Sequence, residues 1–401
     1  MNDKKLETWF FMRPGFSTFR LEPDKHRQYL FGERDRRQRD LVLGSIEEAC
    51  YTKEGHKTAV YGDYGRGKTH QCFNIIYEVQ RRNFPVIPIY IKCSAYKSKE
   101  PFYSLFKEMV LRQSTADLNR VATEYQRRVN NREARPLIDI VYFEDIATVM
   151  SKGLSAVETD VIKNSMRWLG GEPKVPMGLI SKALQPQLTD SREFGAVLRG
   201  IAHMYSEVDG KVPLYLVDEA ERFQNVTNPD AYYTWLASLR DITEILGVAM
   251  VFYIGAKTRN ELPVLFVQEE IIRRIGVSNY IEFTNPSRDE LKDFVCELLE
   301  TFIFKGEVPA AHQIVVEREA LSSEIPEELG KITGGDPQRL RCFPFEPDAF
   351  DEFVEQVSTG DLASKPSEVL VRLQKAALRA MRNDMRTINS RIVQEINTEG
   401  F

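Results

Sequence analysis

The stretch that decides the fold lies at residues 58–69 and reads Thr58-Ala-Val-Tyr-Gly-Asp-Tyr-Gly-Arg-Gly-Lys-Thr69. Its first five residues are a short apolar run ending in glycine, which is typical of a buried strand. Residues 62–69 match the pattern G-x-x-x-x-G-K-[ST], and residues 70–82 have helical spacing. A glycine-rich loop between a strand and a helix cradles phosphate, because its N–H groups turn inward and the helix start adds positive charge.

This loop predicts a nucleotide site whose cofactors are ATP and Mg²⁺. Lys68 is expected to reach the β- and γ-phosphates as a catalytic residue, and Thr69 to offer its hydroxyl to the metal. His70 is expected mainly as a helix-start residue. The alternative is a chance match, which the strand before the loop and the helix after it disfavour. The residues expected to bind the nucleotide are Gly62, Asp63, Tyr64, Gly65, Arg66, Gly67, Lys68, Thr69 and His70.

A second apolar run ends in two acids and reads Pro213-Leu-Tyr-Leu-Val-Asp-Glu219. A carboxylate at the end of such a strand can hold Mg²⁺, so Asp218 is the second expected metal residue after Thr69. The next carboxylate, Glu219, can orient and deprotonate an attacking water and is the expected catalytic base. The alternative is a pair of acids that simply face solvent at a strand end.

Three more apolar runs, at 86–93, 248–255 and 280–283, are separated from these two by helical stretches. Continuous apolar strands between helices predict a parallel sheet that is covered on both faces, so the fold class is α/β. The gap 94–212 between the second and third strands is far longer than one crossover needs. It reads mostly helical, which predicts a large inserted helical subdomain.

Composition limits the classes of protein that remain. The chain has 401 residues, a net charge of −5, and five cysteines with no C-x-x-C pair. A chain with a net negative charge is not attracted to nucleic acid over its whole surface, so any binding to nucleic acid needs local basic patches. The cysteine pattern suits a reducing cytoplasm. No secretion signal is visible, and the longest apolar runs fall short of the ~18–20 residues that a bilayer span needs, so no membrane partner is expected.

An arginine just before the fifth strand has an expected role in hydrolysis. Arg274, in the segment 269–275, could be donated to a neighbouring protomer's γ-phosphate as an arginine finger and is the third expected catalytic residue. The alternative is a surface arginine paired with Glu269 or Glu270. After the fourth strand, Thr258 and Asn260 could sense the γ-phosphate or the attacking water; the alternative there is a plain turn.

Taken together, these motifs resemble those of AAA+ ATPases, in the branch that holds origin-recognition initiators, TnsC-like transposition regulators and BREX-type phage-defence ATPases. The resemblance covers about residues 30–400 and implies strand order 5-1-4-3-2, a nucleotide between the core and a C-terminal helical lid, and a homo-oligomeric ring or filament. It rests on residues 62–69, 214–219, 273–275, 280–291, 166–172, 345–350 and 365–370.

The resemblance implies an N-terminal arm at 1–35, an AAA+ core at 36–288 with the helical insertion at about 100–210, and a helical lid at 289–401. Two features depart from the family pattern. The lid arginine called sensor 2 is replaced by Ser367, with Lys365 nearby and Arg339 as another candidate. The chain also ends at Phe401, where replication initiators continue into a winged helix, so a free-standing origin binder is not expected.

Two basic segments are candidate contacts to double-stranded DNA through their phosphates. The alternative is a solvated face or a contact between protomers. The second segment forms one helical face only if Asn383-Asp384 does not break the helix. A third group, Arg34, Arg36, Arg37 and Arg39 interleaved with acids, predicts a salt-bridged helix start that could lie near the nucleotide base. The two candidate segments are Arg120, Arg127, Arg128, Arg132 and Arg135, and Arg372, Lys375, Arg379, Arg382 and Arg386.

The expected function is an ATP-hydrolysing AAA+ protein that oligomerises and couples its nucleotide state to DNA or to an effector protein. By resemblance alone, the expected setting is phage defence or DNA mobility. The alternative is a non-hydrolysing, nucleotide-gated scaffold or signalling module without DNA binding. Glu219 weighs against that alternative, because a pure binder needs no base.

Overall fold

The computed structural model describes residues 5–13, 16–53, 55–93, 101–224, 229–303, 327–359 and 365–398. The chain forms two compact units. Unit 1 comprises Met1–Arg39, Asp63–Tyr77 and Phe283–Phe401, and unit 2 comprises Asp40–Gly62 and Glu78–Glu282. Helices α2 (Glu33–Thr52) and α3 (Lys68–Arg81) each begin in unit 1 and end in unit 2. The expected domain boundaries stay a prediction.

Unit 2 is built on a five-stranded sheet in the order β2-β3-β4-β1-β5, and every neighbouring pair is parallel. This is the expected order 5-1-4-3-2 read from the other edge, so the α/β prediction is confirmed. The strands are β1 (His56–Gly62), β2 (Val86–Lys92), β3 (Val212–Asp218), β4 (Ala249–Gly255) and β5 (Tyr280–Glu282).

Helices cover the sheet, and this explains the unbroken apolar runs of the central strands. Every residue of β3 and β4 is buried. Helix α9 (Ser191–Asp209) packs against β3, and α11 (Glu269–Ile275) packs against β1. A strand with neighbours on both faces has no position open to water, so it cannot alternate apolar with polar residues.

The parallel register decides where the strand ends meet. Gly62 at the end of β1 pairs with Gly255 at the end of β4, and Val217 of β3 pairs with Phe252 of β4. All five strands run the same way, so their carboxyl ends share one edge of the sheet. Asp218, the last residue of β3, therefore lies at the same edge of the sheet as Gly62, the last residue of β1, and only β4 lies between these two strands.

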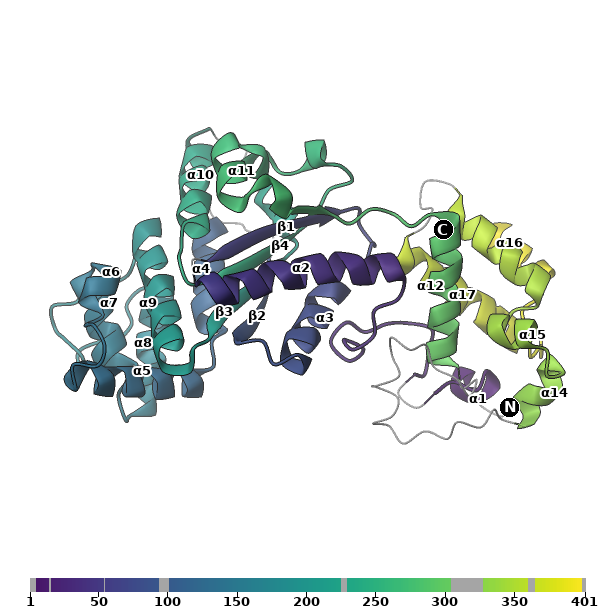
Figure 1. Ribbon diagram of the computed structural model, residues 1–401, viewed down its shortest axis with the longest axis horizontal. Helices are drawn as coiled ribbons and strands as arrows, with labels where there is room; N and C mark the ends of the chain where they lie inside the picture. The colour runs from purple at the N-terminus through teal and green to yellow at the C-terminus, as the bar shows by residue number, and fades with distance from the viewer. Residues whose placement is uncertain are drawn as a thin grey trace. The chain divides into compact units, whose positions relative to one another are not determined.

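The described residues between β2 and β3, from 101 on, are mostly helical, as expected, and Figure 1 shows helices α5 to α9 gathered together. The first helix ends at Leu111, and Ser114, whose hydroxyl accepts the Asp117 N–H, starts the second. Further along, the helix that begins at Glu144 becomes a π-helical turn after residue 148. The helices are α4 (Pro101–Leu111), α5 (Thr115–Asn130), α6 (Ile138–Val141), α7 (Glu144–Thr148), the π-helix η1 (Val149–Gly153), α8 (Thr159–Leu169) and α9.

The rest of unit 2 lies between β3 and β5. A short 3₁₀ helix follows the acidic end of β3, and a longer helix leads to β4. Three short 3₁₀ helices and α11 then connect β4 to β5. These elements are η2 (Ala220–Gln224), α10 (Pro229–Thr243), η3 (Arg259–Glu261), η4 (Val264–Val267), α11 and η5 (Val277–Asn279).

Unit 1 packs the N-terminal segment and the C-terminal helices around one aromatic core. Phe10, Phe19 and Phe302 are fully buried there, and the Trp9 indole N–H donates to the Met385 carbonyl at 2.9 Å. Ser287 begins α12 through a capping box with Glu290. The helices are α1 (Leu6–Trp9), α12 (Arg288–Phe302), α14 (Glu327–Thr333), α15 (Pro337–Cys342), α16 (Pro347–Ser358), α17 (Pro366–Arg382) and α18 (Ser390–Thr398).

Across the described part of the chain, no helix combines the length and the apolar character that crossing a bilayer requires.

Candidate nucleotide-binding site

The phosphate-binding loop leaves β1 and enters α3 in unit 1. Gly65 and Gly67 have φ of 76° and 95°, a left-handed region that glycine occupies at little cost. Among the residues that the structure describes, a Cβ on Gly67 would meet no atom within 4 Å. Helix α3 begins at Lys68, and its first N–H groups lack intrahelical partners. The loop therefore presents an open backbone cradle that fits an anion.

The lysine of the loop is folded back onto the loop itself. Lys68 Nζ donates to the Asp63 carbonyl at 2.8 Å and lies 5.6 Å from the centre of the Tyr64 ring. The Lys68 residue is 9% exposed, whereas Tyr64 is 61% exposed. Thr69 follows in the first turn of α3, partly exposed. The ammonium group is thus already held at the cradle.

Arg66 anchors the loop through its side chain. Its guanidinium pairs with Asp35 at 2.8 Å, donates through Nε to the Thr284 carbonyl at 2.7 Å and lies 4.8 Å from the centre of the Phe283 ring. The side chains of Arg66 and Asp35 are 1% and 12% exposed. Burial raises the pKa of Asp35 and lowers that of Arg66, and each partner's charge opposes the shift.

His70 points toward the N-terminal segment. Its Nε2–H donates to the Tyr29 carbonyl at 2.6 Å. Burial lowers the pKa of His70 below its ordinary 6.5, so the ring is neutral at pH 7. The side chain fixes the start of α3 on residues near Tyr29, which is the helix-start role that was expected first.

Two of the three sensor-2 candidates touch the loop. Lys365 Nζ pairs with Asp63 Oδ2 at 2.9 Å, and the Ser367 N–H donates to the Gly65 carbonyl at 3.2 Å. Arg339 instead lies 3.8 Å from an Asp336 carboxylate oxygen, with its side chain 60% exposed.

The acidic pair ends β3 in unit 2. Asp218 is 2% exposed and accepts hydrogen bonds from the Tyr90 hydroxyl and from the Glu219 N–H, both at 2.9 Å. Glu219 has φ of 57°, which is uncommon outside glycine and is stored strain of the kind found at functional sites.

Two cations hold the Glu219 carboxylate. Lys92 Nζ lies 2.9 Å from Oε1, and Arg222 Nη2 lies 2.5 Å from Oε2 as an ion pair. The next acid, Glu221, accepts the Gly255 N–H at 2.7 Å and so connects this turn to the end of β4.

These neighbours were missed in the sequence analysis. Lys92 lies opposite Asp218 in the β2–β3 register, and Tyr90 lies opposite Leu216. The signal that could have found them is the strand order, because residues ending adjacent parallel strands meet at one edge. Arg222 carries a weaker local signal, three residues after Glu219 on the following turn.

The expected arginine finger is paired within its own chain. Arg274 reaches Glu244 Oε1 at 2.5 Å through Nη2, and its Nη1 donates to the Glu270 carbonyl at 2.8 Å. The alternative partners were the side chains of Glu269 and Glu270, so the carboxylate of Glu244 corrects that expectation. Thr258 and Asn260, the sensor candidates after β4, are exposed around the short helix η3.

Both basic segments are also neutralised in part by acids of their own unit. The single basic face was expected only if Asn383-Asp384 did not break the helix; the helix ends at Arg382 and Asp384 has φ of 59°, so Arg386 is not on the face of α17. Arg386 lies 4.3 Å from the centre of the Trp9 ring instead. The ion pairs are Arg120–Asp209, Arg127–Glu124, Arg128–Glu124, Arg372–Glu368, Arg379–Glu395 and Arg386–Glu328.

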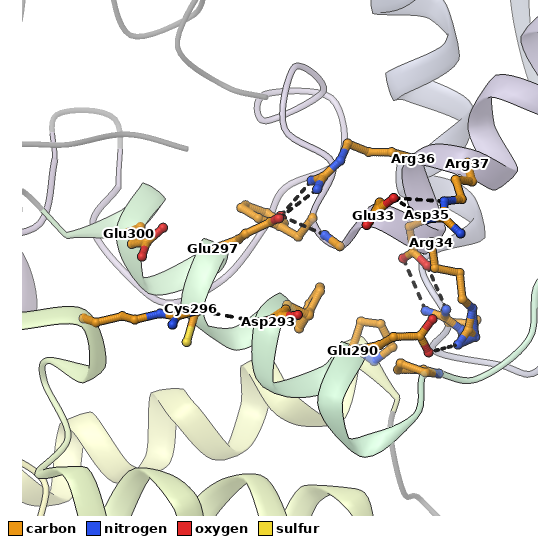
Figure 2. A pocket seen from close by; sticks show the side chains of 17 residues that line it. Glu33, Arg34, Asp35, Arg36, Arg37, Glu290, Asp293, Cys296, Glu297 and Glu300 are labelled. Carbon is orange, nitrogen blue, oxygen red and sulfur yellow. Dashed lines mark hydrogen bonds and ion pairs between the residues drawn. The ribbon is translucent and has the colours of Figure 1, made fainter. Parts of the chain in front are cut away.

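A cavity of about 340 Å³ in unit 1 lies beside Arg66, between the start of α2 and α12. Figure 2 shows the arginines and acids of these two helices converging on it. The Glu297 carboxylate accepts hydrogen bonds from both Arg36 Nη atoms, at 2.7 and 2.8 Å, and from the Gly32 N–H at 2.9 Å. Arg34 pairs with Glu290 at 2.9 Å. The salt-bridged start of α2 is confirmed.

No protein-family model matches the chain, and no curated protein matches it either. Solved structures resemble it at low identity. Drosophila ORC bound to DNA is 13% identical with a TM-score of 0.41, over 92% of this chain and 60% of that one. The Aeropyrum pernix ORC1 protein in complex with DNA is 13% identical with a TM-score of 0.44, over 92% and 66%. The Aeropyrum pernix ORC2 protein, in ADPNP–ADP complexes, is 11% identical with a TM-score of 0.46, over 94% and 71%. The chain thus spans less than two thirds of the first two proteins.

Proposed function

We propose that the chain binds MgATP at the loop 62–69 and hydrolyses it with Asp218 and Glu219. The observation that carries this proposal is the strand order. It brings Gly62, where the loop begins, and Asp218 to the same edge of the sheet with one strand between them. A phosphate loop and a pair of acids at one edge supply the parts that phosphoryl transfer to water needs.

The loop residues fit a triphosphate. The two left-handed glycines and the start of α3 offer N–H groups, and Lys68, whose ammonium donates to a carbonyl of the loop, adds a positive charge. Thr69 and Asp218 would hold Mg²⁺, which when bound neutralises phosphate charge. Glu219 would accept the proton of the attacking water.

Glu219 must exchange one of its cations for water before it can act as a base. The Lys92 side chain is 57% exposed and that of Arg222 is 36% exposed. Exposed ion pairs contribute little to stability, about 0–1 kcal/mol each, so releasing one costs little. The strained backbone at Glu219 keeps the carboxylate beyond the strand end.

Nucleotide binding and steady-state phosphate release on three variants test the proposal. Lys68→Ala should bind MgATP at least tenfold more weakly, because the cradle loses its ammonium group. Glu219→Gln should bind MgATP like the wild type and release phosphate at least 100-fold more slowly. Lys331→Met, a change of an exposed lysine on α14, should match the wild type in both assays. Phosphate release by Glu219→Gln at the wild-type rate would refute the assignment of the base.

A non-hydrolysing scaffold is the second candidate function. The observation in its favour is the double ion pair on Glu219, which occupies the carboxylate. In that case the wild type binds MgATP and releases no phosphate, with or without duplex DNA. Phosphate release that Glu219→Gln abolishes excludes it.

We further propose that the chain assembles with copies of itself, that Arg274 serves a neighbouring protomer, and that DNA or an effector protein is the partner. Arg274 is 29% exposed and would have to leave Glu244. Phage defence or DNA mobility as the setting rests on the resemblance of the motifs. Mass measurement of the particle with a non-hydrolysable ATP analogue, with and without duplex DNA, tests assembly. A monomer under all conditions would refute it.

A further inference from the structure

Two ammonium groups meet at Asp63, the second residue of the phosphate-binding loop. Lys68 Nζ donates to the backbone carbonyl of Asp63 at 2.8 Å. Lys365 Nζ, from the residue just before α17, pairs with the carboxylate Oδ2 of Asp63 at 2.9 Å. The side chains of Asp63 and Lys365 are each 12% exposed, so solvent and salt screen this ion pair only weakly.

The start of α17 also contacts the loop through its backbone. The Ser367 N–H donates to the Gly65 carbonyl at 3.2 Å. The Ser367 hydroxyl oxygen lies 2.2 Å from the position that a Cβ on Gly65 would take, so a side chain there would make that hydroxyl turn away, and the φ of 76° favours glycine in any case. The start of α17 therefore contacts the loop at two points, where Lys365 meets Asp63 and where Ser367 meets Gly65.

The carboxylate of Asp63 is fixed inside the loop. Its Oδ1 accepts the N–H of Tyr64 at 2.7 Å, while Oδ2 faces Lys365. A carboxylate in a cradle for phosphates repels them unless a cation cancels its charge. Lys68 Nζ is bound to the backbone carbonyl of Asp63 and is expected to serve the phosphates, whereas Lys365 Nζ is bound to the carboxylate itself.

We propose that Lys365 is a positioning residue that neutralises Asp63, so that the loop binds nucleotide tightly only while the start of α17 is seated on it. The inference rests on the proposed function, because it concerns affinity for a nucleotide. Lys365 acts on Asp63 in this proposal and not on the phosphates. The N-terminal end of α17 thereby sets the affinity of a loop that lies about 300 residues earlier in the sequence.

Calorimetric titration with MgADP tests the proposal on four variants. Lys365→Met should weaken binding at least tenfold, about 1.4 kcal/mol, because it removes the ammonium that pairs with Asp63 Oδ2. Asp63→Asn removes the charge of the carboxylate and supplies the reference affinity for a second background. In that background Lys365→Met, which gives the double variant, should change the affinity less than about threefold, since there is no carboxylate charge left to neutralise. Lys331→Met is the matched control and should bind like the wild type.

The double variant decides whether Lys365 acts through Asp63. If it binds at least tenfold more weakly than Asp63→Asn, then Lys365 acts on the phosphates and not through Asp63, and the proposal is wrong. Thermal unfolding without nucleotide gives an independent readout. Lys365→Met should lower the melting temperature in the wild-type background and lower it less in the Asp63→Asn background. Equal losses in the two backgrounds would overturn the pairing. A wild type that binds no MgADP would refute the proposed function, and the unfolding cycle would still decide whether the two residues are coupled.

Discussion

Replacing Arg66 by methionine should loosen the phosphate-binding loop more than any change at the surface of the same region. Methionine keeps much of the apolar stem and removes the guanidinium, which leaves Asp35 buried without its partner. The pair is 2.8 Å long, and its side chains are 1% and 12% exposed. Removing one member of a buried pair costs about 3–5 kcal/mol.

The loss should appear as faster amide hydrogen exchange. A tenfold change in exchange rate corresponds to about 1.4 kcal/mol of opening free energy. The expected loss therefore makes exchange on the order of 10²–10³-fold faster in peptides that cover the starts of α2 and α3. Peptides from β3 and β4 serve as an internal reference and should be unaffected. Arg37→Met is the matched control, because Arg37 pairs with Glu33 on the same helix with both side chains more than 70% exposed. Surface pairs of this kind contribute about 0–1 kcal/mol, so exchange should change less than about fivefold.

The double variant Arg66→Met/Asp35→Leu separates charge from packing. Replacing both members of a buried pair by apolar residues of similar volume is often neutral, so exchange should return to within about tenfold of the wild type. The reasoning fails if Arg66→Met exchanges like Arg37→Met. It also fails if the double variant exchanges as fast as Arg66→Met, since the loss would then not come from the unpaired carboxylate.

Three further results are expected. Burial lowers the pKa of Lys57 from 10.5 to about 8, and its ammonium donates to the Ile245 carbonyl at 2.5 Å. Because the folded pKa lies below the unfolded one, wild-type stability should rise between pH 8 and 10.5. Lys57→Met should lack that rise. At pH 7 its free energy of unfolding, measured with urea, should exceed that of the wild type by up to about 3 kcal/mol; a pH profile like that of the wild type would contradict this. Arg274→Ala should keep MgATP binding and lose hydrolysis, and mixing it with Lys68→Ala should restore part of the phosphate release; no recovery at any mixing ratio would argue against an arginine donated between protomers. If duplex DNA binds the basic segments, its affinity should fall steeply with salt concentration, and a flat response would remove DNA as a partner.

The strands and the position of the phosphate loop could be predicted because each depends on local patterns, whereas the order of the strands was implied by the resemblance of the motifs. Buried parallel strands must be apolar at every position, as β3 and β4 are, and a glycine-rich turn between strand and helix has few other uses. Asp218 and Glu219 could be found for the same reason, as acids at the end of an apolar run.

Side-chain partners could not be predicted, because they depend on register and on segments far apart in the sequence. Lys92 contacts Glu219 only because β2 and β3 pair in one register. Lys365 reaches Asp63 across about 300 residues. Arg66 is one of the residues expected to bind nucleotide, and that its side chain pairs with Asp35 could not be predicted, since the motif fixes the backbone of the loop and leaves the side chain at that position open.

Helix continuity was left open in the sequence and is decided by the structure. The basic face was expected to include Arg386 only if the helix continued past residue 383. Asp384 adopts a left-handed conformation there, and Arg386 turns toward Trp9 and Glu328. Asparagine and aspartate adopt that conformation more readily than most residues, so the sequence Asn383-Asp384 indicates a possible helix end.

Calorimetric titration of MgATP into the wild type and into Lys68→Ala tests the central claim most directly. The account predicts one binding site per chain in the wild type and affinity at least tenfold weaker in the variant. Absence of binding heat in the wild type at two temperatures, or equal affinity in the two proteins, would contradict it.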